Sequence, residues 1–303
     1  MNPLSPSGTP SGSGELTIVA PRRNVVTHLR EVLSYRDLIG SLIRKELKVR
    51  YKQSSLGLLW SMAQPMFLLL IYSLVFSVLN PSGGLPRLGI WIMSGLLVWT
   101  FVASSVSTST TSITTNGPLV GKVRFPRAVL PTAAVGAAFA HLLLQFGAFA
   151  VVLVVIRQDV EWRFFWLMPV AILVLTIFLL AFGLLAAAAN VYARDIQHLL
   201  DMLVVGWFWL TPVVYPFGFV EQYLTKHDLP TWLPMLNPVT PVVMAMQRAL
   251  YGATDTATTH LLPDQPVWWY LRNLSIVAVA SVLLLYVALR AFDRAEVNMA
   301  ESL

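Results

Sequence analysis

The chain has 303 residues, of which 56% are hydrophobic and 12% are charged, with a mean hydropathy of +0.67. Charged residues are about half as frequent as in soluble domains, and the apolar residues form blocks of roughly 20, so the composition excludes a soluble globular domain. The net charge of +6 fits Lys and Arg at a membrane surface better than a nucleic-acid footprint, and the lack of cysteine excludes disulfides and thiol chemistry.

The N-terminal quarter begins with a leader and continues with a basic helical segment. Residues 1–24 start with a Pro/Ser/Gly-rich stretch, and we expect a disordered leader because there is little apolar surface to offset the ordering entropy. No basic region leads into an apolar core there, so a cleavable signal is not expected. Over residues 25–55, apolar side chains recur at spacings of three and four between many cations, which predicts an amphipathic helix in the headgroup plane. The same cations could instead be only the basic flank of the next span.

The remainder, residues 56–303, reads as an all-α integral membrane domain. Six apolar segments predict six transmembrane helices, at 56–79, 88–107, 131–156, 164–189, 199–219 and 268–291. Pro65 predicts a kink in the first of them. The Ser/Thr-rich residues 104–115 could hydrogen-bond along or between helices, or face water. Prolines cut residues 220–267 into apolar pieces too short to span, which predicts short re-entrant or interfacial helices.

A proline-punctuated basic segment, residues 116–127, separates the second and third spans. It carries three cations and no acid. With six spans, fifteen of the 21 Lys and Arg residues fall on the side that holds this segment and both termini. The positive-inside rule therefore places the segment and both termini in the cytoplasm of a multi-pass protein of the cytoplasmic membrane.

Several kinds of chemistry are missing from the chain. A phosphate-binding loop G-x-x-x-x-G-K-[ST] fails at Asn116 and at Val123, and no HExxH pattern, metal-ligand cluster or nucleophile elbow is present. Of the five histidines only His141 lies in the middle of a span, where a helix-packing hydrogen bond is favoured over a proton relay, and the spans are otherwise almost free of ionisable groups at mid-depth. This composition disfavours proton- or sodium-driven antiport. We therefore expect a pore whose energy comes from another chain.

Several local patterns resemble polysaccharide-export ABC permeases of the ABC-2 type. The stretch from Arg44 to Trp60, followed by Gln64-Pro65, is similar to the entry of that family's first span, and residues 116–127 to its cytoplasmic loop between spans two and three. Three more patterns match, namely Arg194-Asp195-Ile196, Thr211 to Pro216 and Leu236-Asn237-Pro238. The resemblance covers residues 35–292, and the composition and leader are most similar to the actinobacterial lipid-linked galactan exporter.

The resemblance implies a permease rather than an enzyme. It implies a homodimer that binds two copies of a separate nucleotide-binding ATPase, which would hold ATP and Mg, while this chain holds no cofactor or metal. The substrate would be a polyprenyl-pyrophosphate-linked polysaccharide such as a galactan or an O-antigen-like glycan. Residues 116–127 would be the coupling helix, contacting the ATPase through Asn116, Pro118, Leu119, Lys122, Val123, Arg124, Phe125, Pro126 and Arg127.

Two further sets of candidate residues follow from this resemblance. One set would bind the substrate's pyrophosphate or only anionic lipid headgroups: Arg44, Lys45, Lys48, Arg50 and Lys52. The other would line a sugar channel or belong to an interfacial aromatic belt: Trp99, Trp207, Phe208, Trp209 and Tyr215. The rival functions are an ABC-2 permease for a drug or lipid, and a membrane-embedded glycosyl- or acyltransferase. The latter is disfavoured because no carboxylate or histidine constellation lies near either surface.

Overall fold

The computed structural model describes residues 25–51, 66–67, 70–71, 74–75, 78, 88–123, 125–252 and 261–302. All regular structure in these ranges is helical, which confirms the all-α class. The helices are α1 (Val25–Ser34), α2 (Arg36–Tyr51), α4 (Leu88–Thr115), α5 (Gly117–Lys122), α6 (Val129–Val155), α7 (Trp162–Phe165), α8 (Leu167–Tyr192), α9 (Ile196–Leu210), α10 (Phe217–Lys226), the 3-10 helix η1 (Leu233–Leu236), α11 (Val239–Leu250) and α12 (Val267–Ser302).

Four stretches of the described chain are long and apolar enough to cross a membrane: Gly89–Thr115, Val129–Val155, Trp162–Tyr192 and Val267–Glu296. They correspond to the second, third, fourth and sixth expected spans. The leader (1–24) and most of the first expected span (56–79), with Pro65, lie outside the described residues. The described part of the chain therefore does not establish the expected number of six.

The fifth expected span, 199–219, is not one continuous helix. Helix α9 has 15 residues and ends at Leu210, where Thr211 turns extended with φ −107° and ψ 130°. Pro212 explains this end, because proline lacks an N–H and disfavours helical geometry in the residue before it. The chain then turns and re-enters helix only at α10. The expectation of a single 21-residue helix here was wrong.

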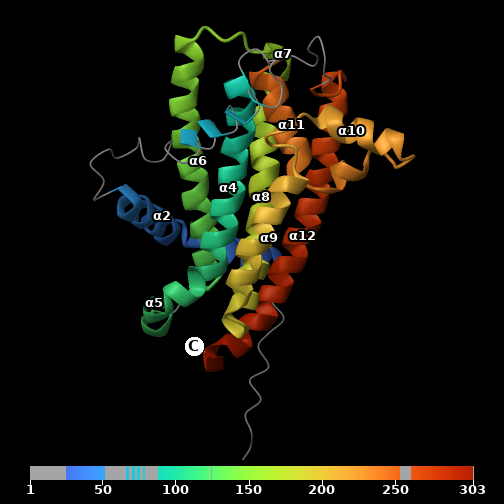
Figure 1. Ribbon diagram of the computed structural model, residues 1–303. Coiled ribbons are helices and arrows are strands. Elements are labelled where there is room, and N and C mark those ends of the chain that lie inside the picture. The colour runs from blue at the N-terminus through green and yellow to red at the C-terminus, as the bar shows by residue number, and fades with distance from the viewer. Residues whose placement is uncertain are drawn as a thin grey trace, which may run out of the picture.

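The interval expected to hold re-entrant helices contains three short ones, α10, η1 and α11. Helix α11 packs against α4 and α8, and nearly all of its side chains are buried. Figure 1 shows it running within the bundle, whereas α10 projects from the side near the same end of the molecule.

Helix α4 is the centre of the bundle. Within its most apolar window 83% of the residues are buried, against 33% for α6 and 28% for α12, so the last two expose long apolar faces. The Ser/Thr-rich residues 104–115 continue α4 as helix instead of forming a separate tail. Their hydroxyls bond back to the carbonyls of preceding turns, as Thr108 Oγ1 does to Ser104 O at 2.7 Å. Such local bonds satisfy hydroxyls without water.

The amphipathic segment forms two helices, α1 and α2, which meet at Tyr35. The Tyr35 N–H bonds to Val32 O, three residues back, and the Ile39 N–H then bonds to Tyr35 O to begin α2. Helix α2 lies along α6, where Ile43 fills the space over Gly136 so closely that a Cβ on that glycine would stand 2.7 Å from Ile43 Cδ1.

Two ends of the bundle can be distinguished in Figure 1. The α5 end holds α5, the start of α9 and the C-terminus of α12, and the opposite end holds α7 and α10. A small apolar cluster at the α5 end, the α5-end cluster, joins α1, α6, α8 and α12 around Val32, Val129, Leu184 and Phe292. A larger core, around α4, α8 and α11, fills the rest of the bundle.

Candidate functional site

The basic segment 116–127 folds as a short helix followed by an extended stretch. Pro118 lies in the first turn of α5, where its missing N–H costs nothing. Val123 is extended, with φ −129° and ψ 134°, and ends the helix. The side chain of Asn116 donates from Nδ2 to Ser112 O at 2.8 Å. It therefore satisfies a carbonyl in the last turn of α4 and does not cap α5.

The two faces of this segment differ in their surroundings. Leu119, Val120 and Phe125 pack against the α5-end cluster, and Pro126 is buried. Pro118, Gly121, Lys122 and Val123 are exposed, and 51% of the Val123 surface is accessible. Arg124 lies outside the described residues. Of the apolar side chains expected to enter a partner's groove, Val123 points to solvent, whereas Phe125 is half-buried in its own protomer.

The end of α12 holds the segment from behind. The backbone N–H of Arg127 donates to Glu296 Oε1 at 2.9 Å. One residue earlier, Ala295 O accepts from the Tyr192 hydroxyl at 2.8 Å. Two residues before Ala295, Asp293 contacts Nδ1 of His28, which is completely buried. A short stretch of α12 thus contacts α1, the end of α8 and the basic segment, and no pattern in the sequence had singled it out.

Helix α2 brings part of the basic cluster next to this segment. Lys45 Nζ lies 3.5 Å from Asn116 Oδ1, across 71 residues of sequence. Arg44 and Lys48 are exposed on the face of α2 that points away from the bundle, since residues four apart share a face. The Arg50 side chain and the whole of Lys52 lie outside what the structure describes. The cations are therefore divided between two directions, one toward α5 and one outward.

The five candidate aromatics divide into side chains that pack within the bundle and side chains that are exposed. Trp99 contacts Trp207 and Phe208 at ring-centroid distances of 6.2 and 5.3 Å; Trp99 is buried in the larger core, and the other two are partly buried and pack against it. Trp209, by contrast, is 57% exposed. The Tyr215 hydroxyl donates to Trp209 O at 2.8 Å and holds the end of α9 in place.

A polar network fixes the turn after α9, and it joins two of the patterns noted in the sequence. Asn237 Oδ1 accepts from Trp207 Nε1 at 2.9 Å, and Asn237 Nδ2 donates to Thr211 Oγ1 at 2.8 Å. Gln247 Nε2 donates to Val213 O at 3.1 Å from α11. The Thr211–Pro216 and Leu236–Pro238 patterns therefore contact each other through their side chains.

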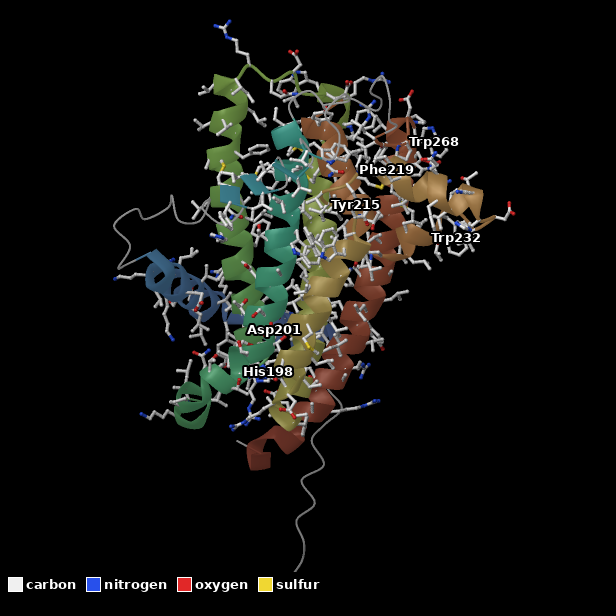
Figure 2. The ribbon with its side chains drawn as sticks, viewed as in Figure 1. His198, Asp201, Tyr215, Phe219, Trp232 and Trp268 are labelled. Carbon is white, nitrogen blue, oxygen red and sulfur yellow. The ribbon has the colours of Figure 1, made fainter. Side chains whose placement is uncertain are left out.

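Helix α9 exposes a face of mixed character. His198, Asp201, Val205 and Trp209 recur at spacings of three and four, and all are exposed. Figure 2 shows His198 and Asp201 toward the α5 end, with Tyr215, Phe219, Trp232 and Trp268 toward the opposite end. Such a face needs a covering that accepts both aromatic and charged groups, because a carboxylate facing lipid is costly.

The described residues contain no group of three or more His, Asp or Glu side chains that could hold a metal ion. The site is therefore characterised by its surfaces: an exposed apolar and basic edge on α5, an outward cationic face on α2, and the exposed face of α9.

Comparison with known proteins identifies similar chains. The profile of the family described as ABC-2 type transporter matches residues 37–251. The chain is 32% identical over 275 residues to the O-antigen export system permease protein RfbA of Myxococcus xanthus, which covers 91% of this chain and 98% of that protein. It is 25% identical over 267 residues to a protein of the same name from Klebsiella pneumoniae, covering 88% and 95% of the two chains.

Proposed function

The chain belongs to the ABC-2 type transporter family, and from this premise we propose that it is the membrane-spanning permease of an ATP-driven polysaccharide exporter. The observation that carries the proposal is the 32% identity to an O-antigen export permease over 98% of that protein's length. A match over the full length includes the basic entry at α2, the segment around α5 and the turn after α9. A drug- or lipid-exporting permease of the same family is the rival that the experiment below must exclude.

The energy source in this proposal is a separate ATPase that docks at the α5 end. The chain carries no phosphate-binding loop, and α5 presents Pro118, Lys122 and Val123 outward on a base packed against the α5-end cluster. An exposed apolar side chain beside a cation on a rigid base is a suitable element for insertion into a partner's groove. In this scheme ATP and Mg bind to the partner, and the α5 end and both termini face the cytoplasm.

The proposed substrate is a glycan linked to a polyprenyl pyrophosphate. Arg44 and Lys48 support it, because their exposed cations on an amphipathic helix suit a phosphate group at the membrane surface. Arg50 and Lys52 would extend the same basic region by their position in the sequence. Galactan and O-antigen-like glycans are both compatible with this chemistry.

A homodimer would place the α9 faces of two protomers around a shared path. The exposed face of α9, with Asp201 toward the α5 end and Trp209 farther along the helix, supports this arrangement, because a charged group is tolerated beside a wet path and disfavoured against lipid. The exposed Trp209 would offer an aromatic face to sugar C–H groups, whereas Trp207 and Phe208 are engaged within the protomer. A second copy or a wet polymer path would keep Asp201 hydrated and would give Trp209 a ligand to contact.

The test is reconstitution of the permease with its ATPase in proteoliposomes. We expect ATP hydrolysis to rise when a polyprenyl-diphosphate-linked oligosaccharide is added, and glycan to accumulate on the opposite side of the membrane. A sugar-free polyprenyl diphosphate and a panel of amphiphilic drugs serve as comparison substrates. Transport of the drugs without transport of the glycan would refute the proposal in favour of its rival.

A further inference from the structure

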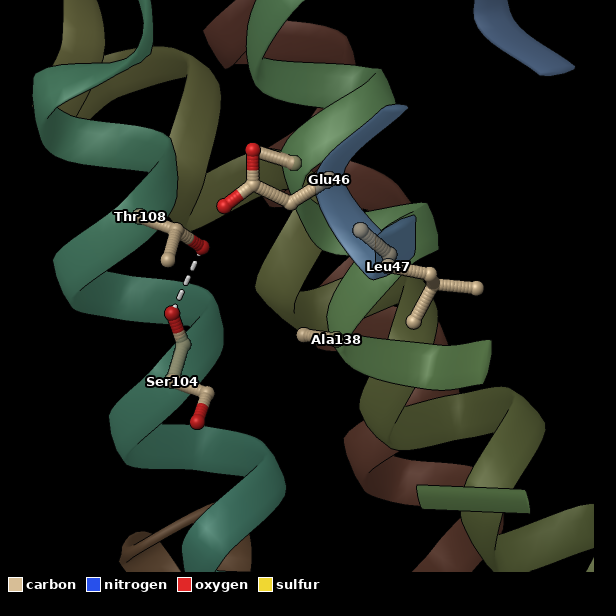
Figure 3. Close-up of a pocket in the computed structure, with 7 residues that line it drawn as sticks. Glu46, Leu47, Ser104, Thr108 and Ala138 are labelled. Atoms are coloured by element: carbon tan, nitrogen blue, oxygen red, sulfur yellow. Dashed lines mark hydrogen bonds between the residues drawn. The ribbon is translucent and has the colours of Figure 1, made fainter. Parts of the chain in front are cut away.

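A groove of about 250 Å³ opens at the α5 end between α2, α4 and α6. It continues toward the middle of the bundle as a narrow space beside Ser104 and Ala138, and Figure 3 shows Glu46 directed from α2 toward Thr108 on α4. The volume of the groove greatly exceeds the ~10–15 Å³ that admits one water molecule. The polar side chains that line it are Lys45, Glu46, Thr108, Thr111, Ser112, Thr115 and Asn116.

Each threonine hydroxyl of the groove already donates its proton to a backbone carbonyl of α4. Thr108 Oγ1 donates to Ser104 O at 2.7 Å, Thr111 Oγ1 to Ser107 O at 3.2 Å, and Thr115 Oγ1 to Thr111 O at 2.8 Å. A hydroxyl has one proton and two lone pairs, so each of these oxygens offers only lone pairs to a ligand. The α4 wall of the groove is therefore a row of hydrogen-bond acceptors.

The formal charges in the groove cancel. Lys45 and Glu46 contribute one cation and one anion, and the Lys45 ammonium lies 3.5 Å from Asn116 Oδ1. A phosphate group would meet several acceptor oxygens and a carboxylate for a single cation, which is an unfavourable balance. A ligand with many O–H groups and no net charge can donate to these acceptors, and its oxygens can accept hydrogen bonds from the Lys45 ammonium. A saccharide has this chemistry.

We propose that this groove binds the sugar part of a glycolipid headgroup, with its hydroxyls donating to the threonine oxygens of α4 and to Glu46. The proposal rests on the function proposed above, and it separates sugar recognition in the groove from phosphate recognition on the outward face of α2. Thr115 and Asn116 border the groove and lead directly into α5. Occupancy of the groove therefore changes the contacts at the base of the segment that meets the ATPase.

The lack of cysteine in the chain permits a footprinting experiment. A single cysteine at Ala134→Cys lies on the α6 wall of the groove, and a control at Ser107→Cys lies exposed on α4 outside it. Each variant, in lipid nanodiscs, is labelled with a maleimide in the presence of a polyprenyl-diphosphate oligosaccharide or of sugar-free polyprenyl diphosphate. We expect the oligosaccharide compound alone to slow labelling at residue 134, and neither compound to slow it at residue 107. Equal protection by the sugar-free compound, or no protection by either, overturns the proposal.

A second measurement does not require an altered residue on α6. Thr111→Val and Thr115→Val keep the shape of the side chain and remove an acceptor, and each should weaken glycolipid binding about threefold to tenfold. Thr111→Ser should restore binding because it keeps the oxygen. Binding that is unchanged in the valine variants also overturns the proposal.

The two proposals fail separately. If the reconstituted transporter exports glycan but the groove gives no sugar-dependent protection, the groove assignment falls and the export function stands. If the groove is protected by the sugar but no glycan is exported, sugar binding stands and the export function falls.

Discussion

Trp207 and Asn237 are joined by a 2.9 Å hydrogen bond, in which the indole Nε1 donates to the side-chain oxygen. The same oxygen also accepts from the Val239 N–H at 3.1 Å, at the start of α11. One amide side chain therefore ties the end of α9 to the short helix that enters the bundle. This arrangement holds Trp207 against the core and leaves Trp209, two residues later, as the exposed aromatic of the pair.

Asn237→Ala should destabilise the permease, because it leaves the Trp207 N–H and the Thr211 hydroxyl without this partner in a half-buried site. A loss of about 1–3 kcal/mol is expected for such groups. The measurement is the midpoint of thermal unfolding of the purified protein in nanodiscs. Gln222→Ala, on the exposed side of α10, is the control and should change the midpoint little. Equal midpoints for the two variants would contradict a structural role for Asn237.

Gly95→Ala and Gly147→Ala should change the stability of the permease in opposite directions. A Cβ on Gly95 would stand 2.9 Å from Val213 O, a backbone atom that cannot rotate away, so α4 and the turn after α9 must separate. A cost of about 1–3 kcal/mol is expected for such overpacking. A Cβ on Gly147 meets no atom within 4 Å, and alanine there should gain about 0.5–1 kcal/mol of helix stability. Thermal unfolding of both variants in parallel measures the difference in sign.

Val123→Asp should prevent productive docking of the ATPase without unfolding the permease, because this side chain is exposed on α5. The measurement is co-purification with the ATPase, together with the thermal midpoint of the permease alone. Val123→Thr, which keeps the shape, should retain docking. Phe125→Asp is a less selective change, since Phe125 packs on the α5-end cluster and a buried carboxylate also lowers stability. Normal docking of the ATPase to the Val123→Asp variant would refute α5 as the surface that binds it.

Glu296→Ala should weaken the link between hydrolysis and export. Glu296 Oε1 accepts a hydrogen bond from the Arg127 N–H and so fixes the end of the basic segment that follows α5. The measured quantity is the amount of glycan exported per ATP hydrolysed in proteoliposomes. Glu296→Gln keeps an acceptor oxygen and should recover most of this ratio. Arg294→Ala, an exposed neighbour on the same helix, is the matched control. A role in stability alone would lower the amount of transporter but leave the ratio unchanged.

Trp209→Ala and Trp207→Ala should separate transport from folding. Trp209 is exposed, so its removal should reduce glycan export while the thermal midpoint stays near that of the unaltered protein. Trp207 is partly buried against the core and donates to Asn237, so its removal should lower stability, with the ~3–5 kcal/mol of a fully buried aromatic as the upper bound. The measurements are export in proteoliposomes and thermal unfolding. Full export by Trp209→Ala would mean that this side chain is not part of the polymer path.

The sequence by itself determined the membrane class, most of the long spans and the isolation of the basic segment 116–127. These features are local: the length and hydropathy of a segment decide whether it can lie in hydrocarbon, whatever its neighbours do. The missing phosphate-binding loop was equally local. The fifth span was misjudged because its apolar residues continue past Pro212, and hydropathy does not register a lost backbone N–H.

Only the tertiary structure decided which way each candidate residue faces. Phe125 and Val123 are two positions apart, yet one packs on the α5-end cluster and the other points to solvent. Lys45 meets Asn116 across 71 residues, while Lys48 on the same helix points outward. Glu296 and Asn237 acquire their roles from partners far away in the chain, and the threonines of α4 line a groove only because α2 and α6 pack nearby. Such contacts depend on how the helices pack against one another, and no periodicity within a single helix encodes its neighbours.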